Sequence, residues 1–319
     1  MKHNLKITFL LVFVFFAAQI TGLVITSKYV HTEEHINPKT HAVVKEIVSE
    51  NLPYNLERPD LNESTSFLWI LSAILIGTVL LLVLIKFRSM GLWKLWFFLA
   101  VFSTMSIAFS AFIQQGIAAI LAFALAVLKI YKPNAIVQNV TEVFIYGGLA
   151  AIFVPVLSIT SVFLLLISIS IYDIIAVRHT KHMVKLAKFQ AKSNVFAGLF
   201  IPYAHGRIAA KNEEGIMRAS GKSSDFLGSP KRTKEGRVAV LGGGDIGFPL
   251  LFAGVVMKNL LLANQFTSGF LKSLIVPVFA TLALLYLLVK GEKDRFYPAM
   301  PYISAGCFVG YLIVLAIHQ

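Results

Sequence analysis

Long apolar stretches, separated by short polar segments, make up most of the chain. Nine of them approach the length of about 20 apolar residues that a helix needs to cross a bilayer, so we predict nine membrane-spanning helices. The fifth is the weakest, because it is short and Pro155 ends or kinks it, which would place Thr141 and Glu142 at its mouth. The predicted spans are residues 5–26, 67–85, 92–113, 116–131, 143–156, 158–177, 238–262, 270–289 and 299–317.

The composition agrees with this pattern. The 319 residues are 57% hydrophobic and 14% charged, whereas soluble domains carry about 25% charged residues. A membrane span must satisfy its backbone hydrogen bonds internally, which a helix does. The predicted fold class is therefore an all-α polytopic membrane protein. The first span could instead be a cleaved signal peptide, but its length of about 20 residues favours a retained helix.

The basic residues predict the orientation, because cytoplasmic loops carry an excess of Lys and Arg. With the N-terminus placed in the cytoplasm, only six of the 29 Lys and Arg residues fall outside and the other 23 fall inside. Those six are Lys28, Lys39, Lys45, Arg58, Lys258 and Lys272. We therefore predict a cytoplasmic N-terminus and an extracytoplasmic C-terminus. The same distribution accounts for the net charge of +13, so we expect membrane lipid rather than nucleic acid as a partner.

The spans divide the chain into three parts. Residues 1–178 carry the first six spans, residues 179–237 form a basic cytoplasmic loop, and residues 238–319 carry the last three spans. The loop is rich in Gly, Ser and Lys, and we expect it to be flexible. Its first part, residues 181–196, has the spacing of an amphipathic basic helix that lies on the anionic inner leaflet.

The first outside loop, residues 27–66, is acidic, and we expect an amphipathic surface segment there. It carries His31, His35 and His41, but their spacing fixes no ligand geometry, so we predict no metal site. Cys307 is the only cysteine, which excludes an intrachain disulfide and a cysteine metal cluster. We expect no cofactor.

Two aspartates lie inside predicted spans. Asp245 follows three glycines, Gly242, Gly243 and Gly244, and Asp173 lies near the end of the sixth span. An aspartate in a membrane helix is energetically costly, so each is a candidate for a functional site. Three consecutive glycines would let the backbone of another chain approach closely.

The two aspartates are expected at similar depth. Asp173 precedes Arg178 by five residues, or about 8 Å of helix, and Asp245 follows Arg237 by eight residues, or about 12 Å. Because the two spans run in opposite directions, both carboxylates would lie on the cytoplasmic side.

Such a pair has a defined chemistry. Two carboxylates in a site of low dielectric constant do not both ionise easily, so one keeps a proton near neutrality. The ionised carboxylate can act as a base on water while the other donates a proton to a carbonyl oxygen. The alternative is that the same aspartates serve an ion channel or a proton-coupled transporter.

A dinucleotide-binding site is a further alternative, because Gly242, Gly244 and Gly247 match the G-x-G-x-x-G fingerprint. That site needs a βαβ unit and an acidic residue about 20 residues later. Residues 246–291 contain no acidic residue, and we reject this interpretation. The chain also lacks the H-E-x-x-H motif of zinc proteases.

Three motifs resemble those of the presenilin and signal peptide peptidase family, the GxGD intramembrane aspartyl proteases. Their order, spacing and span numbers agree over residues 158–319. The third motif usually reads PAL, and Met300 replaces the leucine here, which is a nearly isosteric change. The motifs are Tyr172-Asp173 in the sixth span, Gly242-x-Gly244-Asp245 in the seventh, and Pro298-Ala299-Met300-Pro301 at the start of the ninth.

The resemblance implies a nine-span, presenilin-like fold and an intramembrane aspartic endopeptidase that cuts transmembrane helices of membrane-protein substrates. It implies that Asp173 and Asp245 are the catalytic pair and that residues 298–301 pack beside them and shape the substrate site. The short loops are similar to those of microbial, archaeal-type homologues, which implies a multi-pass protein of a prokaryotic plasma membrane. Accessory subunits and the oligomeric state are not specified by the sequence.

Overall fold

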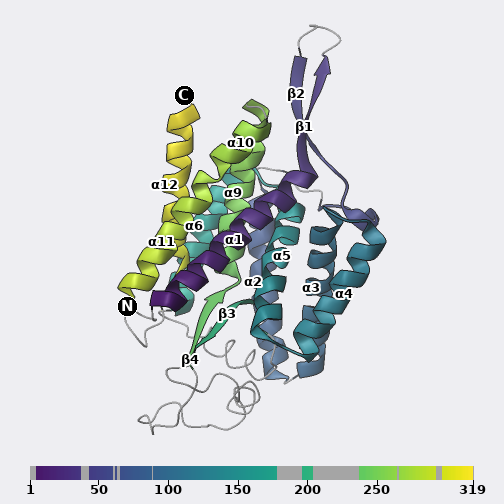
Figure 1. The fold of residues 1–319 in the computed structure, drawn as a ribbon, viewed down its shortest axis with the longest axis vertical. Coiled ribbons are helices and arrows are strands. Elements are labelled where there is room, and N and C mark those ends of the chain that lie inside the picture. Colours follow the sequence, from purple (N-terminus) through teal and green to yellow (C-terminus); the bar gives the residue numbers. More distant parts are fainter. Residues whose placement is uncertain are drawn as a thin grey trace.

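The arrangement of the helices comes from a computed structural model. It describes residues 5–36, 43–59, 62, 65–87, 89–177, 196–203, 237–263, 266–291 and 297–318. The helices lie side by side, and two small pairs of strands lie at opposite ends of the bundle (Figure 1). This architecture confirms the predicted helical fold.

The elements follow one another along the chain with short connections. The helices are α1 (Leu5–Tyr29), the 3-10 turn η1 (Pro53–Asn55), α2 (Ser66–Lys86), α3 (Met90–Ser110), α4 (Gln115–Tyr131), α5 (Ala135–Phe153), α6 (Ile159–Ile175), α9 (Gly244–Ala263), α10 (Phe266–Ser273), α11 (Ile275–Lys290) and α12 (Met300–His318). The strands are β1 (Val30–Ile36), β2 (Val43–Ser49), β3 (Gly198–Tyr203) and β4 (Arg237–Gly242).

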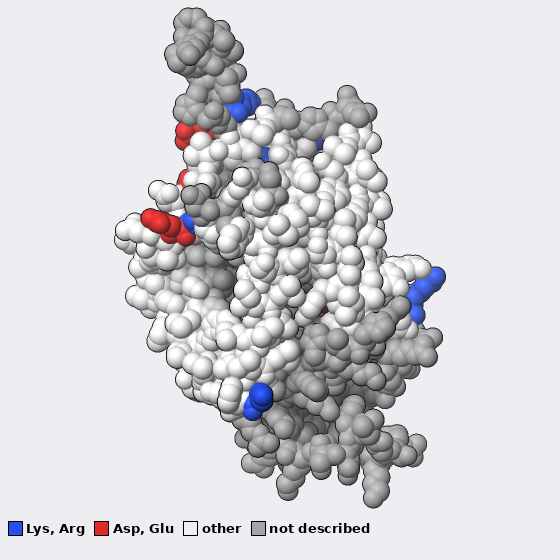
Figure 2. Space-filling model, turned by 180° about the vertical axis from the view of Figure 1, so that it is seen from behind, with Lys and Arg blue, Asp and Glu red and all other residues white. Residues whose placement is uncertain are grey.

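Within the described residues, seven stretches of helix are long and apolar enough to cross a membrane. They are Leu5–Tyr29, Ser66–Leu84, Met90–Ser110, Ala135–Phe153, Gly244–Leu262, Thr267–Lys290 and Met300–Ile317. Helices α4 and α6 are also apolar but shorter, with 17 residues each. Figure 2 shows one face of the molecule, on which a broad uncharged surface lies between charged side chains near its two ends.

Helix α5 begins earlier than predicted. The fifth span was expected over residues 143–156, but α5 begins at Ala135, where the side chain of Asn134 accepts a hydrogen bond of 3.0 Å from the N–H of Ile136. Glu142 therefore lies inside the helix and is buried, and its predicted place at a mouth is wrong. The hydropathy pattern missed the first two turns because their polar side chains face protein rather than lipid.

The seventh predicted span is not helical throughout. Its first residues belong to β4, which pairs antiparallel with β3, and α9 begins only at Gly244. The depth that the helical rise predicted for Asp245 is therefore wrong, because a strand rises about twice as far per residue. The strand forms because its partner, residues 198–203, comes from a distant part of the chain.

Both loops that carry strands differ in part from expectation. The surface segment expected in the first outside loop contains the antiparallel pair β1–β2, in which Val30 is opposite Ser49. The described part of the basic loop forms β3. Residues 181–195 of the expected basic helix, residues 204–236 of the loop, and His41 lie outside the described residues.

Helix α9 occupies the centre of the bundle. In its membrane-spanning window 78% of the residues are buried, compared with 39% or less in the other six windows. It packs against α1, α5, α6 and α12, and α1 crosses α5 where two small residues meet. A Cβ atom added to Gly147 would lie 3.3 Å from the Cα of Gly22, so glycine permits the close approach of these two helices.

Lys258 ties α9 to the connection between α5 and α6. Its side chain is only 4% exposed, and its Nζ donates hydrogen bonds of 3.0 Å to the carbonyl of Pro155 and 2.9 Å to that of Leu157. These carbonyls follow the end of a helix, where backbone acceptors lack partners within the helix. The lysine therefore supplies donors that the bilayer cannot supply.

We expect Lys258→Met to lower stability, because two buried carbonyl groups would lose their donor. The expected cost is about 1–3 kcal/mol, measured as a lower Tm of the purified protein in detergent. Lys86→Met, which changes an exposed lysine of α2, is the control and should leave the Tm unchanged. Equal Tm values for the two variants would contradict this role for Lys258.

Candidate active site

Asp173 lies in the last turn of α6 and is 8% exposed. The backbone N–H of Met300, at the start of α12, donates a hydrogen bond of 3.2 Å to Oδ2 of Asp173, and the N–H of Ala299 is a second donor. One turn earlier, the hydroxyl of Ser170 donates to that of Ser304 at 2.9 Å. Helix α6 and the start of α12 are thus held together on the side where Asp173 lies.

Asp245 lies in the first turn of α9 and is half-buried. The backbone N–H of Gly242 donates a hydrogen bond to its carboxylate. A Cβ atom at Gly242 would lie 3.3 Å from Oδ2 of Asp245, so the carboxylate folds closely over the backbone at this position. The glycine therefore has a structural reason within the chain itself.

The structure brings the two predicted aspartates together. Asp173 and Asp245 come from α6 and α9, which pack against each other, and their carboxylates are close enough to interact electrostatically. Asp245 follows directly after β4, which lies at the end of the bundle opposite β1–β2 (Figure 1). A pair of this kind can place one base and one acid beside the same water molecule.

The glycine turn is enclosed from one side by α5. The N–H of Gly243 donates a hydrogen bond of 3.2 Å to the carbonyl of Ala197, and a Cβ atom at Gly243 would lie 2.5 Å from the hydroxyl oxygen of Tyr146. Gly244 is exposed and begins α9. The turn therefore has a protein wall on one side at Gly243 and an exposed residue at Gly244.

The strand and turn before α9 do not build a nucleotide site. In the described part of the chain β4 pairs only with β3, and it does so antiparallel. A dinucleotide site needs parallel strands linked by a helix. The fingerprint at Gly242, Gly244 and Gly247 instead serves a tight connection between a strand and a membrane helix.

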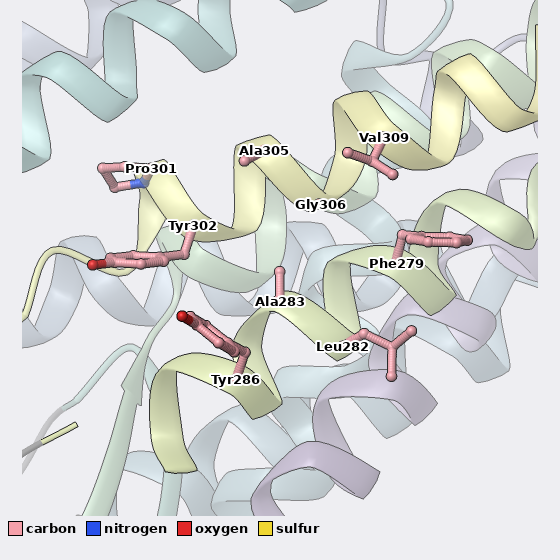
Figure 3. Close-up of a pocket in the computed structure, with 9 residues that line it drawn as sticks. All are labelled: Phe279, Leu282, Ala283, Tyr286, Pro301, Tyr302, Ala305, Gly306 and Val309. Carbon is pink, nitrogen blue, oxygen red and sulfur yellow. The ribbon is translucent and has the colours of Figure 1, made fainter. Parts of the chain in front are cut away.

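The motif at residues 298–301 has two sides. Pro298 and Met300 are buried, and Met300 faces Asp173 through its amide. Pro301 lines an apolar groove of about 500 Å³ between α11 and α12, where Tyr286 and Tyr302 also lie (Figure 3). The motif thus separates the aspartate from a lipid-side groove. The groove is lined by Phe279, Leu282, Ala283, Tyr286, Pro301, Tyr302, Ala305, Gly306 and Val309.

Tyr172 precedes Asp173 on α6 and is half-buried. Its position next to the aspartate follows from the sequence alone. The structure adds no specific contact for its side chain to the argument, and its site-shaping role remains a prediction.

Sequence reasoning missed polar residues that contact the site from other helices. Gln19 of α1 is fully buried, and its amide donates a hydrogen bond of 2.9 Å to the carbonyl of Ile246, next to Asp245. Glu142 and Tyr146 of α5, with Lys129 of α4, form a buried cluster beside the glycine turn. An isolated polar residue inside an apolar run was the available signal for Gln19 and Glu142.

Among the described residues, no group of three or more His, Cys, Asp or Glu side chains could hold a metal ion. His31 interacts instead with two glutamates of the outside loop, at 3.4 Å from Glu33 and 3.8 Å from Glu50. The chemistry available at the described site is therefore that of the two carboxylates and the backbone amides around them.

Residues 42–319 match the family model described as signal-peptide peptidase, presenilin aspartyl protease. No protein with a curated description matches the chain. Two solved structures of a presenilin family intramembrane aspartate protease are similar at 18% identity. The structure in space group C222 has a TM-score of 0.59 and covers 97% of this chain and 99% of its own. The structure in P2 has a TM-score of 0.53 and covers 96% of each. At this identity the likeness shows the fold.

We expect Gly243→Ala to destabilise the protein, because its methyl group would overlap the hydroxyl of Tyr146. Overpacking of this kind costs about 1–3 kcal/mol, measured as a lower Tm in detergent. Gly247→Ala is the matched control, because its methyl group would lie 3.6 Å from the Tyr146 ring, an ordinary contact. Inside a helix that change should be neutral or stabilising by up to about 1 kcal/mol. Similar Tm values for the two variants would contradict the close packing at Gly243.

Proposed function

Because the chain belongs to the family of signal-peptide peptidase and presenilin aspartyl proteases, we propose that it cleaves transmembrane helices within the bilayer with Asp173 and Asp245 as its catalytic pair. Members of this family are hydrolases, and the apolar helices make the chain an integral, multi-pass membrane protein. The observation that carries the proposal is the electrostatic contact between two carboxylates from neighbouring helices. Each has backbone donors that orient it.

The proposed reaction needs one proton shared by the pair. The ionised carboxylate removes a proton from a water molecule, whose oxygen attacks the carbonyl carbon of the peptide bond, while the protonated carboxylate donates its proton to the carbonyl oxygen. Transfer of a proton to the amide nitrogen then allows the C–N bond to break, which releases a carboxyl group and an amine. Asp173 and Asp245 act as a unit, so the proton belongs to the pair.

A substrate helix hides its peptide bonds in its own hydrogen bonds, so it must unwind before it is cut. We propose that the unwound segment adds a strand to the enzyme near Gly242–Gly244 or the 298–301 segment. The short sheet β3–β4 ends at Gly242 and supports this mode, because it brings extended backbone directly beside Asp245. Val240 of β4 is 50% exposed and leaves part of that strand accessible.

We propose nine spans with a cytoplasmic N-terminus, in a prokaryotic plasma membrane. The seven long apolar stretches together with α4 and α6 correspond one by one to the nine predicted spans. Helix α1 begins near the β3–β4 end of the bundle and α12 ends near the opposite end (Figure 1). An odd number of spans requires this separation of the two ends. Water would then reach the aspartates from the cytoplasmic side.

A channel or proton-coupled transporter that uses the same aspartates is the alternative from the sequence. The family match does not favour it. The two functions differ in one measurable respect, because a transporter moves solute without cutting a polypeptide.

The proposal is tested by cleavage of a single-span helical reporter peptide by the purified protein in detergent. We expect wild type to cut the reporter, and Asp173→Asn and Asp245→Asn each to reduce the rate by at least about 100-fold, since acid–base groups contribute about that much or more. Glu57→Gln, an exposed change in the outside loop, is the control and should cut at the wild-type rate. Cutting that survives both aspartate substitutions would overturn the assignment of the pair.

The pH dependence gives an independent test of the shared proton. We expect a bell-shaped profile, because the reaction requires one protonated and one ionised carboxylate. Activity should fall at low pH, where both carboxylates are protonated, and at high pH, where both are ionised. The measurement is the initial rate on the same reporter across the pH range in which the protein stays folded. A flat profile would contradict a reaction that depends on the pair.

A further inference from the structure

The glycine turn that carries Asp245 rests against a buried polar cluster that the reaction does not use. The cluster consists of Gln138, Glu142 and Tyr146 on α5 with Lys129 on α4. We infer that this cluster positions the Gly242–Gly244 turn, and with it Asp245, relative to Asp173. The inference rests on the proposed function for its activity readout, and it has a second readout that does not.

Glu142 is the centre of the cluster. Its Oε1 accepts hydrogen bonds from Nζ of Lys129 at 2.7 Å and from Nε2 of Gln138 at 2.9 Å, and its Oε2 accepts one from the hydroxyl of Tyr146. The side chains of Lys129 and Glu142 are each only 2% exposed. Nζ of Lys129 also donates to the hydroxyl of Thr141 at 2.9 Å. Both oxygens of the carboxylate therefore have partners.

An ion pair at this depth is not explained by stability alone. The cost of removing two charges from water often equals or exceeds their attraction, so a buried pair can commonly be replaced by apolar residues without loss. Charged groups inside membrane segments are rare and usually mark a function. The function of Lys129 and Glu142 is best found by asking what the rest of the cluster contacts.

On one side the cluster holds β3. Nε2 of Gln138 donates to the carbonyls of Phe196 at 2.8 Å and Gly198 at 2.9 Å. The neighbouring Asn139 both donates to the carbonyl of Phe200 and accepts from its N–H, each at 2.9 Å. Helix α5 therefore binds the backbone of this strand in the way that a neighbouring strand would.

On the other side the same backbone segment binds the catalytic turn. Gly198 pairs with Gly242 in the β3–β4 register, and Ala197 accepts a hydrogen bond from the N–H of Gly243. A continuous series of contacts thus runs from α5 through residues 196–200 to the turn before Asp245. Displacement of β3 would move the turn with it.

Tyr146 makes the second, direct contact. Its hydroxyl and ring pack against Gly243, where an added Cβ atom would lie 2.5 Å from the hydroxyl and 3.3 Å from the ring carbons. It also interacts electrostatically with Asp245. Its hydrogen bond to Glu142 fixes the ring in this orientation. The positions 138, 142 and 146 are four residues apart, so all three side chains lie on one face of α5.

Tyr146→Phe tests the direct contact, because it keeps the ring and removes the hydrogen bond to Glu142. We expect kcat on the reporter to fall about 10-fold with KM changed less than about 2-fold, since small displacements of reacting groups cost up to about 100-fold in rate. We also expect the ratio of products cut at neighbouring peptide bonds to change. A lower folded fraction cannot change that ratio. Tyr131→Phe, at a 73% exposed position on α4, should retain the wild-type ratio.

Two double variants test the acceptor at position 142. Lys129→Met with Glu142→Gln removes both charges but leaves an oxygen to accept from Tyr146, whereas Lys129→Met with Glu142→Leu removes that oxygen. We expect the first to keep the wild-type product ratio and the second to resemble Tyr146→Phe. Because neither carries an unpaired charge, neither suffers the large penalty of breaking a buried pair. Equal product ratios in the two double variants would overturn the inference.

Hydrogen–deuterium exchange of residues 237–247 gives the readout that does not depend on cleavage. We expect faster exchange of this segment in Tyr146→Phe and in the double variant with Glu142→Leu than in wild type and Tyr131→Phe, because the amide of Gly243 would lose its fixed partner at Ala197. Unchanged exchange would overturn the inference even if cleavage were never observed. Failure of wild type to cut any reporter, with exchange altered as expected, would instead count against the proposed protease function.

Discussion

A carboxylate inside a lipid bilayer needs polar partners that only the protein can supply. Asp173 has the amides of Ala299 and Met300, Asp245 has the amide of Gly242, and Glu142 has three side-chain donors. In each case at least one partner comes from a backbone turn or from another helix. The helix packing around these acids can be understood as the means of bringing such donors to them.

This requirement explains why the backbone is irregular beside both aspartates. Free amides are found where a helix begins, and both α9 and α12 begin next to an aspartate. Non-helical backbone at membrane depth is tolerated only where protein or a water-filled cavity surrounds it. The β3–β4 pair and α5 provide that surrounding on one side, and α6 and α12 provide it on the other.

Buried polar side chains tie the helices together in the rest of the bundle. Gln19 joins α1 to α9, Lys258 joins α9 to the α5–α6 connection, and Ser170 joins α6 to Ser304 of α12. In lipid, helices associate through close packing and hydrogen bonds rather than through the hydrophobic effect. All of these contacts involve one of the two helices that carry the aspartates, so they also limit how far Asp173 and Asp245 can move apart.

The sequence by itself determined the helical membrane class, the order of the helices and the family. These follow from local properties, namely the length of apolar runs and short motifs around Asp173, Asp245 and residues 298–301. The tertiary structure alone decided that residues 237–242 form a strand, because the strand depends on residues 198–203 as its partner. It also decided that Glu142 is buried with Lys129. A hydropathy pattern treats each charge as a preference for water, and only the packing of α4 against α5 supplies the partner that makes burial possible.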